Sequence, residues 1–219
     1  GLGSSQSKIV QINVSKLTWP GTYSVTASLR YMHADTSIET TARTLTLNVL
    51  SNKSISFDSS IVNISVLSGS SNWSALAINN TGNDNLTGMN LVCVSGEVCT
   101  GFTITFNESN FAIARNGSRI VNINSTAGSG KSAGTYSGII NVTEQNISRT
   151  INISIVVPES LTWSASPLLI NSTKAAGQSG TIREITISNT GNVNITALLN
   201  STNSSIVVPN KSSIEVPLN

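Results

Sequence analysis

The segment ITISNTGNVNITALLN, residues 185–200, repeats a pattern that the chain has already used as INNTGNDNLT at residues 78–87. In both copies, alternating apolar and polar residues lead to an Asn-Thr-Gly-Asn turn and resume after it. Such alternation is typical of β-strands with one buried face, and Asn and Gly are residues that tight turns favour. An internal repeat of short strands therefore organises this chain.

Composition indicates the fold class and excludes several kinds of partner. The 219 residues are 10% charged and rich in Ser, Thr, Asn, Val and Ile, which favours pleated sheet over helix. The net charge of +2 is spread without a Lys/Arg cluster, so we expect no nucleic-acid partner. No apolar run reaches the roughly 18 residues of a membrane span, and we expect any signal peptide to be absent or already removed. We predict an all-β protein without a cofactor.

Residues 51–158 read as one complete unit. Short alternating segments are separated by turn signals such as SGSS, NTGN and NGS, a spacing that is typical of an immunoglobulin-like β-sandwich. The expected strands are 61–66, 73–79, 86–94, 98–106, 111–114, 119–124, 135–142 and 149–157.

The two ends of the chain look like parts of a second unit. SLTWSAS (160–166) parallels SISFDSS (54–60), and NKSSIEVPLN (210–219) parallels NESNFAIARN (107–116). Near the other end, KIVQIN matches RIVNIN and PGTYSVTASL matches AGTYSGIINV. We therefore expect two immunoglobulin-like domains, one complete and one split between the chain termini. The expected parts are an N-terminal donor arm and strand (1–15), the C-terminal part of the split domain (16–50), the complete domain (51–158) and the N-terminal part of the split domain (159–219).

Most asparagines lie in glycosylation sequons. Of the 26 asparagines, 17 begin an Asn-x-Ser/Thr triplet in which x is not proline. Residues i and i+2 of a strand share a face, so a triplet such as NIS points Asn and Ser outward and Ile inward. We therefore expect covalent N-glycans and an extracellular location. The candidates are Asn13, Asn52, Asn63, Asn72, Asn79, Asn85, Asn107, Asn116, Asn124, Asn141, Asn146, Asn152, Asn171, Asn194, Asn200, Asn203 and Asn210.

The NTGN turn, the late PGTY strand and the alternating Val, Ile and Thr resemble the NEW3 and CARDB class of immunoglobulin-like modules on archaeal surface proteins. With its sequons and split repeat, the chain also resembles the subunits of archaeal thread-like pili, which are glycosylated and assemble by donor-strand exchange. This resemblance implies a cell-surface filament that links copies of itself, with a role in adhesion or cell–cell contact.

Three arrangements of the split unit are open. Residues 1–50 fold onto 159–219 of the same chain, or N-terminal strands complete the neighbouring subunit, or the sequence is an excerpt of a longer tandem array. Half a sandwich exposes unpaired strand edges, so we expect addition of strands in trans, which propagates as an open fibre. The smallest donated element is the strand Lys8–Ser15, and the largest is all of 1–50. Val10, Ile12 and Val14 share one face of that strand and are the expected polymerisation residues.

Two cysteines, Cys93 and Cys99, flank a predicted hairpin tip at Ser95-Gly96-Glu97. Cysteines that face each other across such a tip can form a disulfide, which fits an oxidising compartment. The closed loop is short, so the bond should contribute only about 2–3 kcal/mol. Two free thiols are the alternative, because one histidine and two cysteines cannot complete a zinc site.

Patterns that suggest catalysis are weak. GSGKSAGT (128–135) contains G-x-S-x-G, but a strand rather than a helix follows it, so we expect a hairpin loop. His33 is the only histidine, and we expect a loop residue rather than a member of a catalytic triad. In the NTGN turns, Gly82 and Gly191 should supply a left-handed position rather than part of a calcium loop.

We predict no enzyme activity. The alternative function is a carbohydrate-binding or spacer module of a larger cell-surface protein, because Trp19, Trp73 and Trp163 offer a sugar-binding platform. However, Trp163 aligns with Phe57, which favours a repeated core aromatic. The scarcity of carboxylates also predicts folding that depends only weakly on pH.

Overall fold

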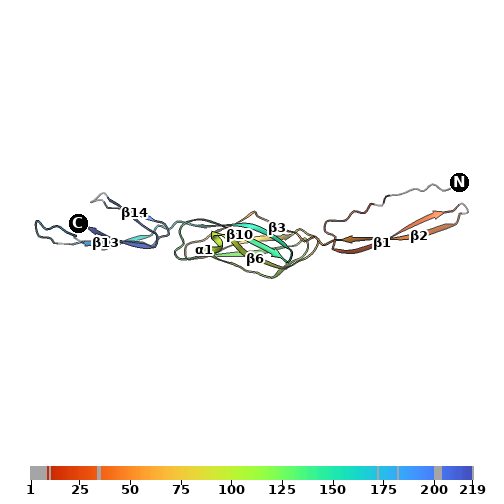
Figure 1. The fold of residues 1–219 in the computed structure, drawn as a ribbon, viewed down its shortest axis with the longest axis horizontal. Coiled ribbons are helices and arrows are strands. Elements are labelled where there is room, and N and C mark those ends of the chain that lie inside the picture. The colour runs from red at the N-terminus through yellow and green to blue at the C-terminus, as the bar shows by residue number, and fades with distance from the viewer. Residues whose placement is uncertain are drawn as a thin grey trace.

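The computed structural model describes residues 9, 11–33, 36–171, 173–181, 183–199 and 204–218. The regular secondary structure of these residues is almost entirely β-strand, which confirms the all-β prediction. The molecule is long and narrow, with a hairpin at the N-terminal end, a sandwich in the middle and further sheets at the C-terminal end (Figure 1). Within the described ranges, no helix has the length and apolar character needed to cross a bilayer.

The central sandwich consists of two packed sheets. One sheet has the strand order β3-β5-β9-β7, and the other has the order β4-β11-β10-β6-β8. The pair β4 and β11 is parallel, and the other pairs are antiparallel. The strands are β3 (Ile55–Phe57), β4 (Ile61–Ser65), β5 (Ser71–Asn80), β6 (Leu86–Gly96), β7 (Phe102–Phe106), β8 (Phe111–Ile113), β9 (Ser118–Ala127), β10 (Gly134–Glu144) and β11 (Ile147–Val157).

Apolar and polar residues alternate along these strands, so each sheet has one apolar face, and this face packs against the other sheet to form the core. Leu76 and Ile78 of β5 are fully buried, and so are Ile140 and Val142 of β10 in the opposite sheet. Each side chain of this size contributes about 1.5–3 kcal/mol when it is removed from water. The sandwich therefore has its own continuous hydrophobic core.

The segment after Gly96 differs from the prediction. The short helix α1 (Glu97–Gly101) follows β6, so the predicted strand 98–106 is wrong over its first residues. Gly96 has a φ of 91°, and glycine adopts this left-handed conformation without steric cost, so the chain can turn away from the sheet. Val98 of α1 is buried over Gly138 of β10, where a Cβ would lie 2.8 Å from that of Val98.

At the N-terminal end, β1 (Gly21–Met32) and β2 (Ile38–Val49) form an antiparallel hairpin. β1 thus contains most of the segment PGTYSVTASL, which the sequence matched to AGTYSGIINV of the complete unit. Of the strand predicted at Lys8–Ser15, the described residues 9 and 11–15, which include Ile12 and Val14, are exposed and lack regular secondary structure in the isolated chain. Val10 lies outside the described residues.

At the C-terminal end there are two smaller sheets. One has the order β12-β13-β16, and the other pairs β14 with β15. Ile187, Val208 and Val216 from both sheets form a small buried cluster. The strands are β12 (Trp163–Ser166), β13 (Arg183–Asn189), β14 (Ile195–Leu199), β15 (Ser204–Val208) and β16 (Ser212–Leu218).

Two kinds of connection cross between sheets where the sequence predicted hairpins. The first NTGN turn joins β5 to β6 in the opposite sheet, and the second joins β13 to β14 in the same way. Residues 128–133 join β9 to β10, again in opposite sheets. These predictions are wrong because alternation marks the ends of strands but not the sheet to which each strand belongs.

Candidate assembly interface

The N-terminal hairpin has the register of the β10–β11 hairpin in the central sandwich. Gly21 pairs with Val49 as Gly134 pairs with Val157. The backbone φ is 150° at Gly21 and 151° at Gly134. β1 and β2 therefore correspond, residue by residue, to β10 and β11.

A tyrosine fixes the start of both hairpins in the same way. The Tyr23 hydroxyl donates a hydrogen bond to the carbonyl of Trp19 at 2.9 Å, and the Tyr136 hydroxyl donates to that of Ser132 at 2.8 Å. Trp19 consequently occupies the place of Ser132.

The apolar face that β10 and β11 bury is uncovered in the hairpin. Val142 of β10 is fully buried, whereas its counterpart Leu29 is 63% exposed. Arg43 is a mismatch on this face, because the corresponding residue of β11 is the buried Ile151. The apolar side chains that share the face are Tyr23, Val25, Ala27, Leu29, Tyr31, Leu45, Leu47 and Val49.

The C-terminal sheets follow other strands of the sandwich. Asn80 donates from Nδ2 to the carbonyl of Ile113 at 3.2 Å, and Asn189 donates to that of Val208 at 3.1 Å. The side-chain oxygen of each buried asparagine accepts from the glycine two residues later at 3.0 Å. β12, β13, β14, β15 and β16 therefore correspond to β3, β5, β6, β8 and β9.

This register corrects the alignment of the C-terminal end. The main-chain N–H of Arg115 donates to Oδ1 of Asn85, and that of Asn210 donates to Oδ1 of Asn194. Asn210 thus corresponds to Arg115, not to Asn107 as the sequence pattern suggested. The C-terminal copy therefore reaches one strand further, and β16 occupies the place of β9 that the sequence assigned to KIVQIN.

The register also corrects the place of Trp163. Trp163 pairs with Asn189 as Ile55 pairs with Asn80, so Trp163 replaces the buried Ile55 rather than Phe57. Trp163 is nevertheless 63% exposed, because nothing covers this end of the C-terminal sheets.

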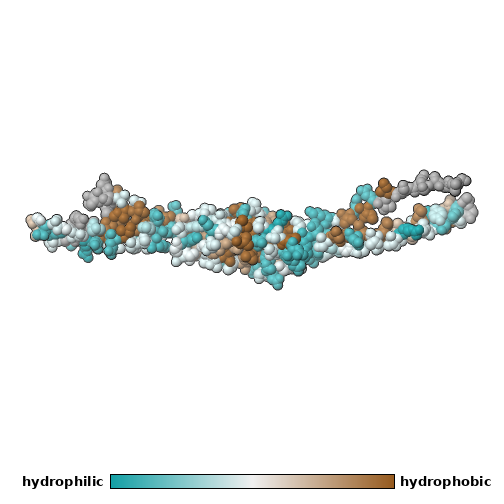
Figure 2. Space-filling view, viewed as in Figure 1, coloured by the Kyte–Doolittle hydropathy of each residue, from teal (hydrophilic) through white to brown (hydrophobic). Residues whose placement is uncertain are grey.

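The described part of the C-terminal end contains no counterpart of β7, α1, β10 or β11. The strand β6 pairs with both β8 and β10, whereas β14 pairs only with β15. Residues 167–171, which follow β12, form no strand, whereas β4, which comes after β3, pairs with β11. Figure 2 shows an apolar patch near β14. Large apolar side chains exposed in this part are Leu161, Trp163, Leu168, Leu169, Leu198 and Val207.

The last asparagine of each NTGN turn holds the linker that enters its unit. Asn83 donates from Nδ2 to the carbonyl of Leu50 at 3.0 Å, and its Oδ1 accepts from the N–H of Asn52 at 2.7 Å. Asn192 is bonded in the same way, to the carbonyl of Pro158 at 2.8 Å and the N–H of Ser160 at 2.7 Å.

The glycines of these turns have a different role from the one predicted. Neither Gly82 nor Gly191 has a positive φ, so the left-handed turn position is wrong. A Cβ on Gly82 would instead collide with the carbonyl oxygen of Asn52, and one on Gly191 with that of Ser160. Glycine is required because the linker passes directly against the turn.

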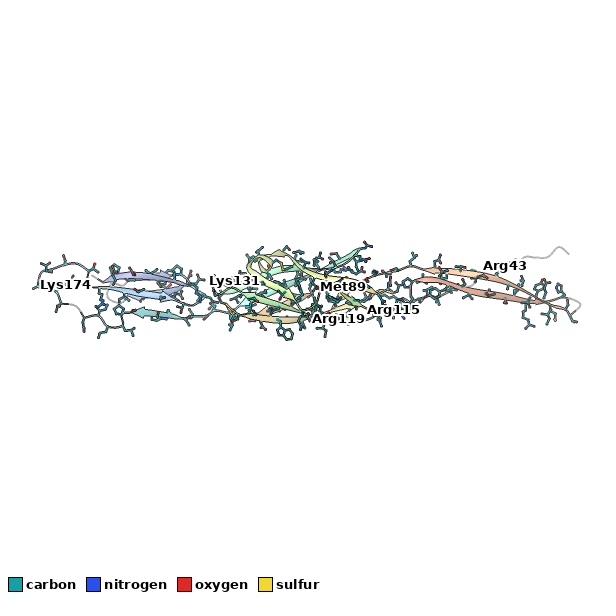
Figure 3. The ribbon with its side chains drawn as sticks, turned by 90° about the horizontal axis from the view of Figure 1, so that it is seen from below. Arg43, Met89, Arg115, Arg119, Lys131 and Lys174 are labelled. Atoms are coloured by element: carbon teal, nitrogen blue, oxygen red, sulfur yellow. A yellow bond between two sulfur atoms is a disulfide. The ribbon has the colours of Figure 1, made fainter. Side chains whose placement is uncertain are left out.

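The sandwich meets its two neighbours through corresponding positions, one at each end (Figure 3). On the hairpin side, the Arg115 guanidinium donates to the carbonyl of Leu17 and lies 4.4 Å from the centroid of the Trp19 ring. On the other side, Asn210 donates to Oγ of Ser132 at 3.1 Å. Since Asn210 corresponds to Arg115 and Ser132 to Trp19, both junctions use the same pair of positions.

The sequon asparagines lie at accessible positions. None of the fifteen that the structure describes is buried, while Asn200 and Asn203 lie outside the described residues. β10 and β11 carry the sequons of Asn141 and Asn152, but the hairpin strands β1 and β2 carry none.

The predicted disulfide is confirmed. Cys93 and Cys99 are bonded with their Cα atoms 5.4 Å apart. The bond joins β6 to α1 instead of crossing a hairpin, so it fastens the helix that carries the buried Val98.

One buried ion pair lies near the start of the sandwich. Nζ of Lys53 is 2.6 Å from Oε1 of Glu144, whose side chain is almost fully buried. Lys53 is the residue after Asn52, whose N–H is bound by Asn83, and Leu161 is the residue after Ser160, whose N–H is bound by Asn192. Leu161 therefore corresponds to Lys53. Because Glu144 stands at the place of Tyr31, the split unit has Leu and Tyr where the sandwich has this pair.

The half-buried Asp84 and the exposed Glu39 have lowered pKa values. The Ser51 hydroxyl donates to Asp84 and lowers its pKa. At the open end of the hairpin, a hydrogen bond from Tyr31 and a weaker effect of a hydrogen bond from His33 lower the pKa of Glu39. His33 thus lies in the turn predicted for it, with Nε2 3.1 Å from Oε2 of Glu39. In the described ranges, His, Cys, Asp and Glu nowhere gather into a group of three that could hold a metal ion.

Comparison with known proteins yields only weak structural similarities. No family model and no curated protein matches it. A family 123 glycoside hydrolase from Clostridium perfringens is 14% identical over 48% of this chain and 27% of its own, with a TM-score of 0.39. The E. coli chaperone DraB is 12% identical over 76% of this chain and 87% of its own, with a TM-score of 0.37.

The human CEP192 PapD-like domain 7 is 12% identical over 48% of this chain and 86% of its own, again with a TM-score of 0.37. Similarities with such low identities and TM-scores do not support a conclusion about function. The fold itself defines the class, an all-β protein with an immunoglobulin-like sandwich.

Proposed function

We propose that this protein is a structural subunit of an extracellular, glycosylated filament that serves adhesion or cell–cell contact. N-terminal strands of one subunit complete the C-terminal sheets of the next. One observation carries the proposal: the hairpin and the C-terminal sheets lie at opposite ends of the molecule, yet their counterparts pack together in the central sandwich (Figure 1).

The placement of the two ends favours assembly between subunits. The whole sandwich separates the hairpin β1–β2 from the C-terminal sheets of its own chain, so the hairpin does not fold back onto those sheets there. Contact between two different surfaces of neighbouring copies is heterologous, and such contacts propagate as open fibres. Pairing would remove Val25, Leu29 and Leu45 from water, each contributing about 1.5–3 kcal/mol before the costs of association.

The junctions indicate how successive sandwiches would be arranged. Arg115 and Trp19 join the hairpin to the sandwich, while Asn210 and Ser132 join the sandwich to the C-terminal sheets. If each hairpin belongs to a completed sandwich, every junction in the fibre uses the same two positions. The fibre is then a uniform row of sandwiches, two for each subunit.

Glycosylation and an extracellular location are supported by the accessible sequons and by the disulfide. The hairpin strands lack acceptors, and Ser28 and Thr44 replace the sequon residues Asn141 and Asn152. Strands that must enter a neighbour would thus carry no bulky sugar.

Paired substitutions on β1 test this function. Val25 and Thr26 are neighbours that point to opposite faces of the strand. We expect the full chain to form filaments by electron microscopy and Val25→Asp to abolish them, while Thr26→Asp leaves them intact. Both variants should fold, because these side chains are exposed in the isolated chain. A full chain that stays monomeric at high concentration, or Val25→Asp filaments like those of the wild type, would overturn the proposal.

A further inference from the structure

We infer that the whole β1–β2 hairpin is the donated element, and that it enters the next subunit between residues 167–171 and β14. The inference rests on the proposed function and adds the acceptor site and the register. In the central sandwich, β11 and β10 lie between β4 and β6. Replacing each strand by its counterpart gives a five-stranded sheet in the order 167–171, β2, β1, β14, β15.

The first argument is that the hairpin carries a larger side chain than β10 at one position, where the C-terminal sheets have room for it. β10 carries Gly138 because α1 places Val98 against it. The hairpin carries Val25 at that position, and the C-terminal sheets have no counterpart of α1 among their described residues. Val25, which is 59% exposed, therefore fills the space that Val98 fills in the complete sandwich.

The second argument is a paired replacement across the two ends of the chain. In the sandwich, Lys53 and Glu144 neutralise each other in a nearly buried site. In the split unit, Leu161 and Tyr31 stand at these positions, and both are exposed in the isolated chain. A charged pair has thus changed to an apolar pair at two sites about 130 residues apart in the chain, which is expected if the two sites meet across the subunit boundary.

The third argument excludes the edge of β16. Of the C-terminal strands that lie at a sheet edge, β14 and β16 are the two whose counterparts, β6 and β9, have partners on both sides in the central sandwich. In β9, the N–H of Asn122 points away from β5 and toward the side of β7, where it donates to Oδ1 of Asn107, the residue that follows β7. Pro217 of β16 corresponds to Asn122, since Asn210 corresponds to Arg115. Proline has no N–H to offer, and a proline on an outer edge blocks the addition of a strand. The edge of β14 is therefore the acceptor.

The register follows from the pairing of β10 with β6. Thr143 of β10 lies opposite Asn90 of β6. Ala197 pairs with Ile206 as Met89 pairs with Phe111, so Leu198 corresponds to Asn90.

Arg30 corresponds to Thr143 because β1 and β10 share one register. We therefore place Arg30 of one subunit opposite Leu198 of the next, with both side chains pointing outward.

Disulfide trapping in the assembled full chain tests this register. Residues directly opposite in antiparallel strands have Cα atoms about 4.5–5.5 Å apart, which a disulfide can bridge. The double variant Arg30→Cys, Leu198→Cys, assembled under conditions that keep Cys93–Cys99 intact and then oxidised, should run as a covalent ladder on non-reducing gels. The matched control Thr26→Cys, Leu198→Cys puts its thiols on the same face but about 13 Å apart along the strand, so it should give no ladder.

The outcomes separate this inference from the proposed function. Filaments without a ladder, or equal ladders from both variants, would overturn the hairpin register and leave the filament standing. The absence of filaments in the unsubstituted chain would overturn both. Failure of only the Arg30→Cys, Leu198→Cys variant to assemble would also count against the register, because outward positions should tolerate cysteine.

Discussion

Nζ of Lys53 lies 2.6 Å from Oε1 of the buried Glu144, and the same two positions in the split unit hold Leu161 and Tyr31. Equivalent positions thus hold an ion pair in the central sandwich and two apolar side chains in the split unit. An ion pair of this kind is stable only while both charges are present, because a single buried charge has lost its hydration without a partner.

We predict that Lys53→Leu destabilises the central sandwich by about 3–5 kcal/mol, since it leaves the Glu144 carboxylate unpaired. The double variant Lys53→Leu, Glu144→Tyr should recover most of this loss, because it installs the pair found in the split unit. Urea unfolding followed by circular dichroism measures both. A double variant that is no more stable than Lys53→Leu would show that the two sites are not equivalent.

Substitution of the turn glycine should disturb the linker. Gly82→Ala places a methyl group against the carbonyl oxygen of Asn52, and such overpacking typically costs about 1–3 kcal/mol. Gly128→Ala is the matched control, because its Cβ would meet nothing within 4 Å. Thermal unfolding of both variants should show a lower midpoint only for Gly82→Ala. Equal midpoints would contradict the close contact between Gly82 and the linker at Asn52.

Reduction of the Cys93–Cys99 bond should cost about 2–3 kcal/mol, as expected for a short closed loop. The effect should appear as a lower unfolding midpoint in the presence of a reductant. In the Cys93→Ser, Cys99→Ser variant, the midpoint should not depend on the reductant. Loss of α1 packing should accompany reduction, seen as faster amide exchange around Val98.

The hairpin junction depends on Arg115. Replacing it by alanine removes the hydrogen bond to the Leu17 carbonyl and the stacking over Trp19, so amide exchange of residues 16–19 should accelerate. Arg119→Ala, which removes only a surface pair with Glu108, serves as the control and should leave that exchange unchanged. Equal exchange in both variants would show that Arg115 does not hold the junction.

Stability should depend little on pH until the medium is strongly acidic. The pKa of Asp84 and that of Glu39 are lower in the folded chain than in the unfolded chain. Groups of this kind stabilise the fold above their unfolded pKa of about 4, and the contribution is lost as pH falls through the lower folded pKa. Glu39 is exposed and Asp84 is only half-buried, so the change should be small. A steep loss of stability between pH 7 and 5 would contradict this expectation.

Local sequence patterns were sufficient for most of the strands and for the finding that the two ends repeat parts of the middle, but not for the register of that repeat. Alternation placed β5, β9, β10 and β11 within a few residues, because one face of each strand must be apolar to enter the core. The cysteine spacing identified the disulfide. The helix α1 was missed because it is a single turn, too short to show a helical period.

The contacts at the junctions, and those between the NTGN turns and the linkers, could not be predicted from the sequence. Arg115 and Leu17 are far apart in the chain, and no local pattern shows that they meet. The role of Gly82 also depends on a distant segment, since the linker at Asn52 passes against it.

By itself, then, the sequence determined which residues form strands, which faces are apolar and that the ends repeat parts of the middle. Only the tertiary structure decided the strand order, the register that equates Trp163 with Ile55, and the separation of hairpin and C-terminal sheets to opposite ends. The physical reason is that alternation is a property of neighbouring residues, whereas pairing and packing bring together residues far apart in the chain.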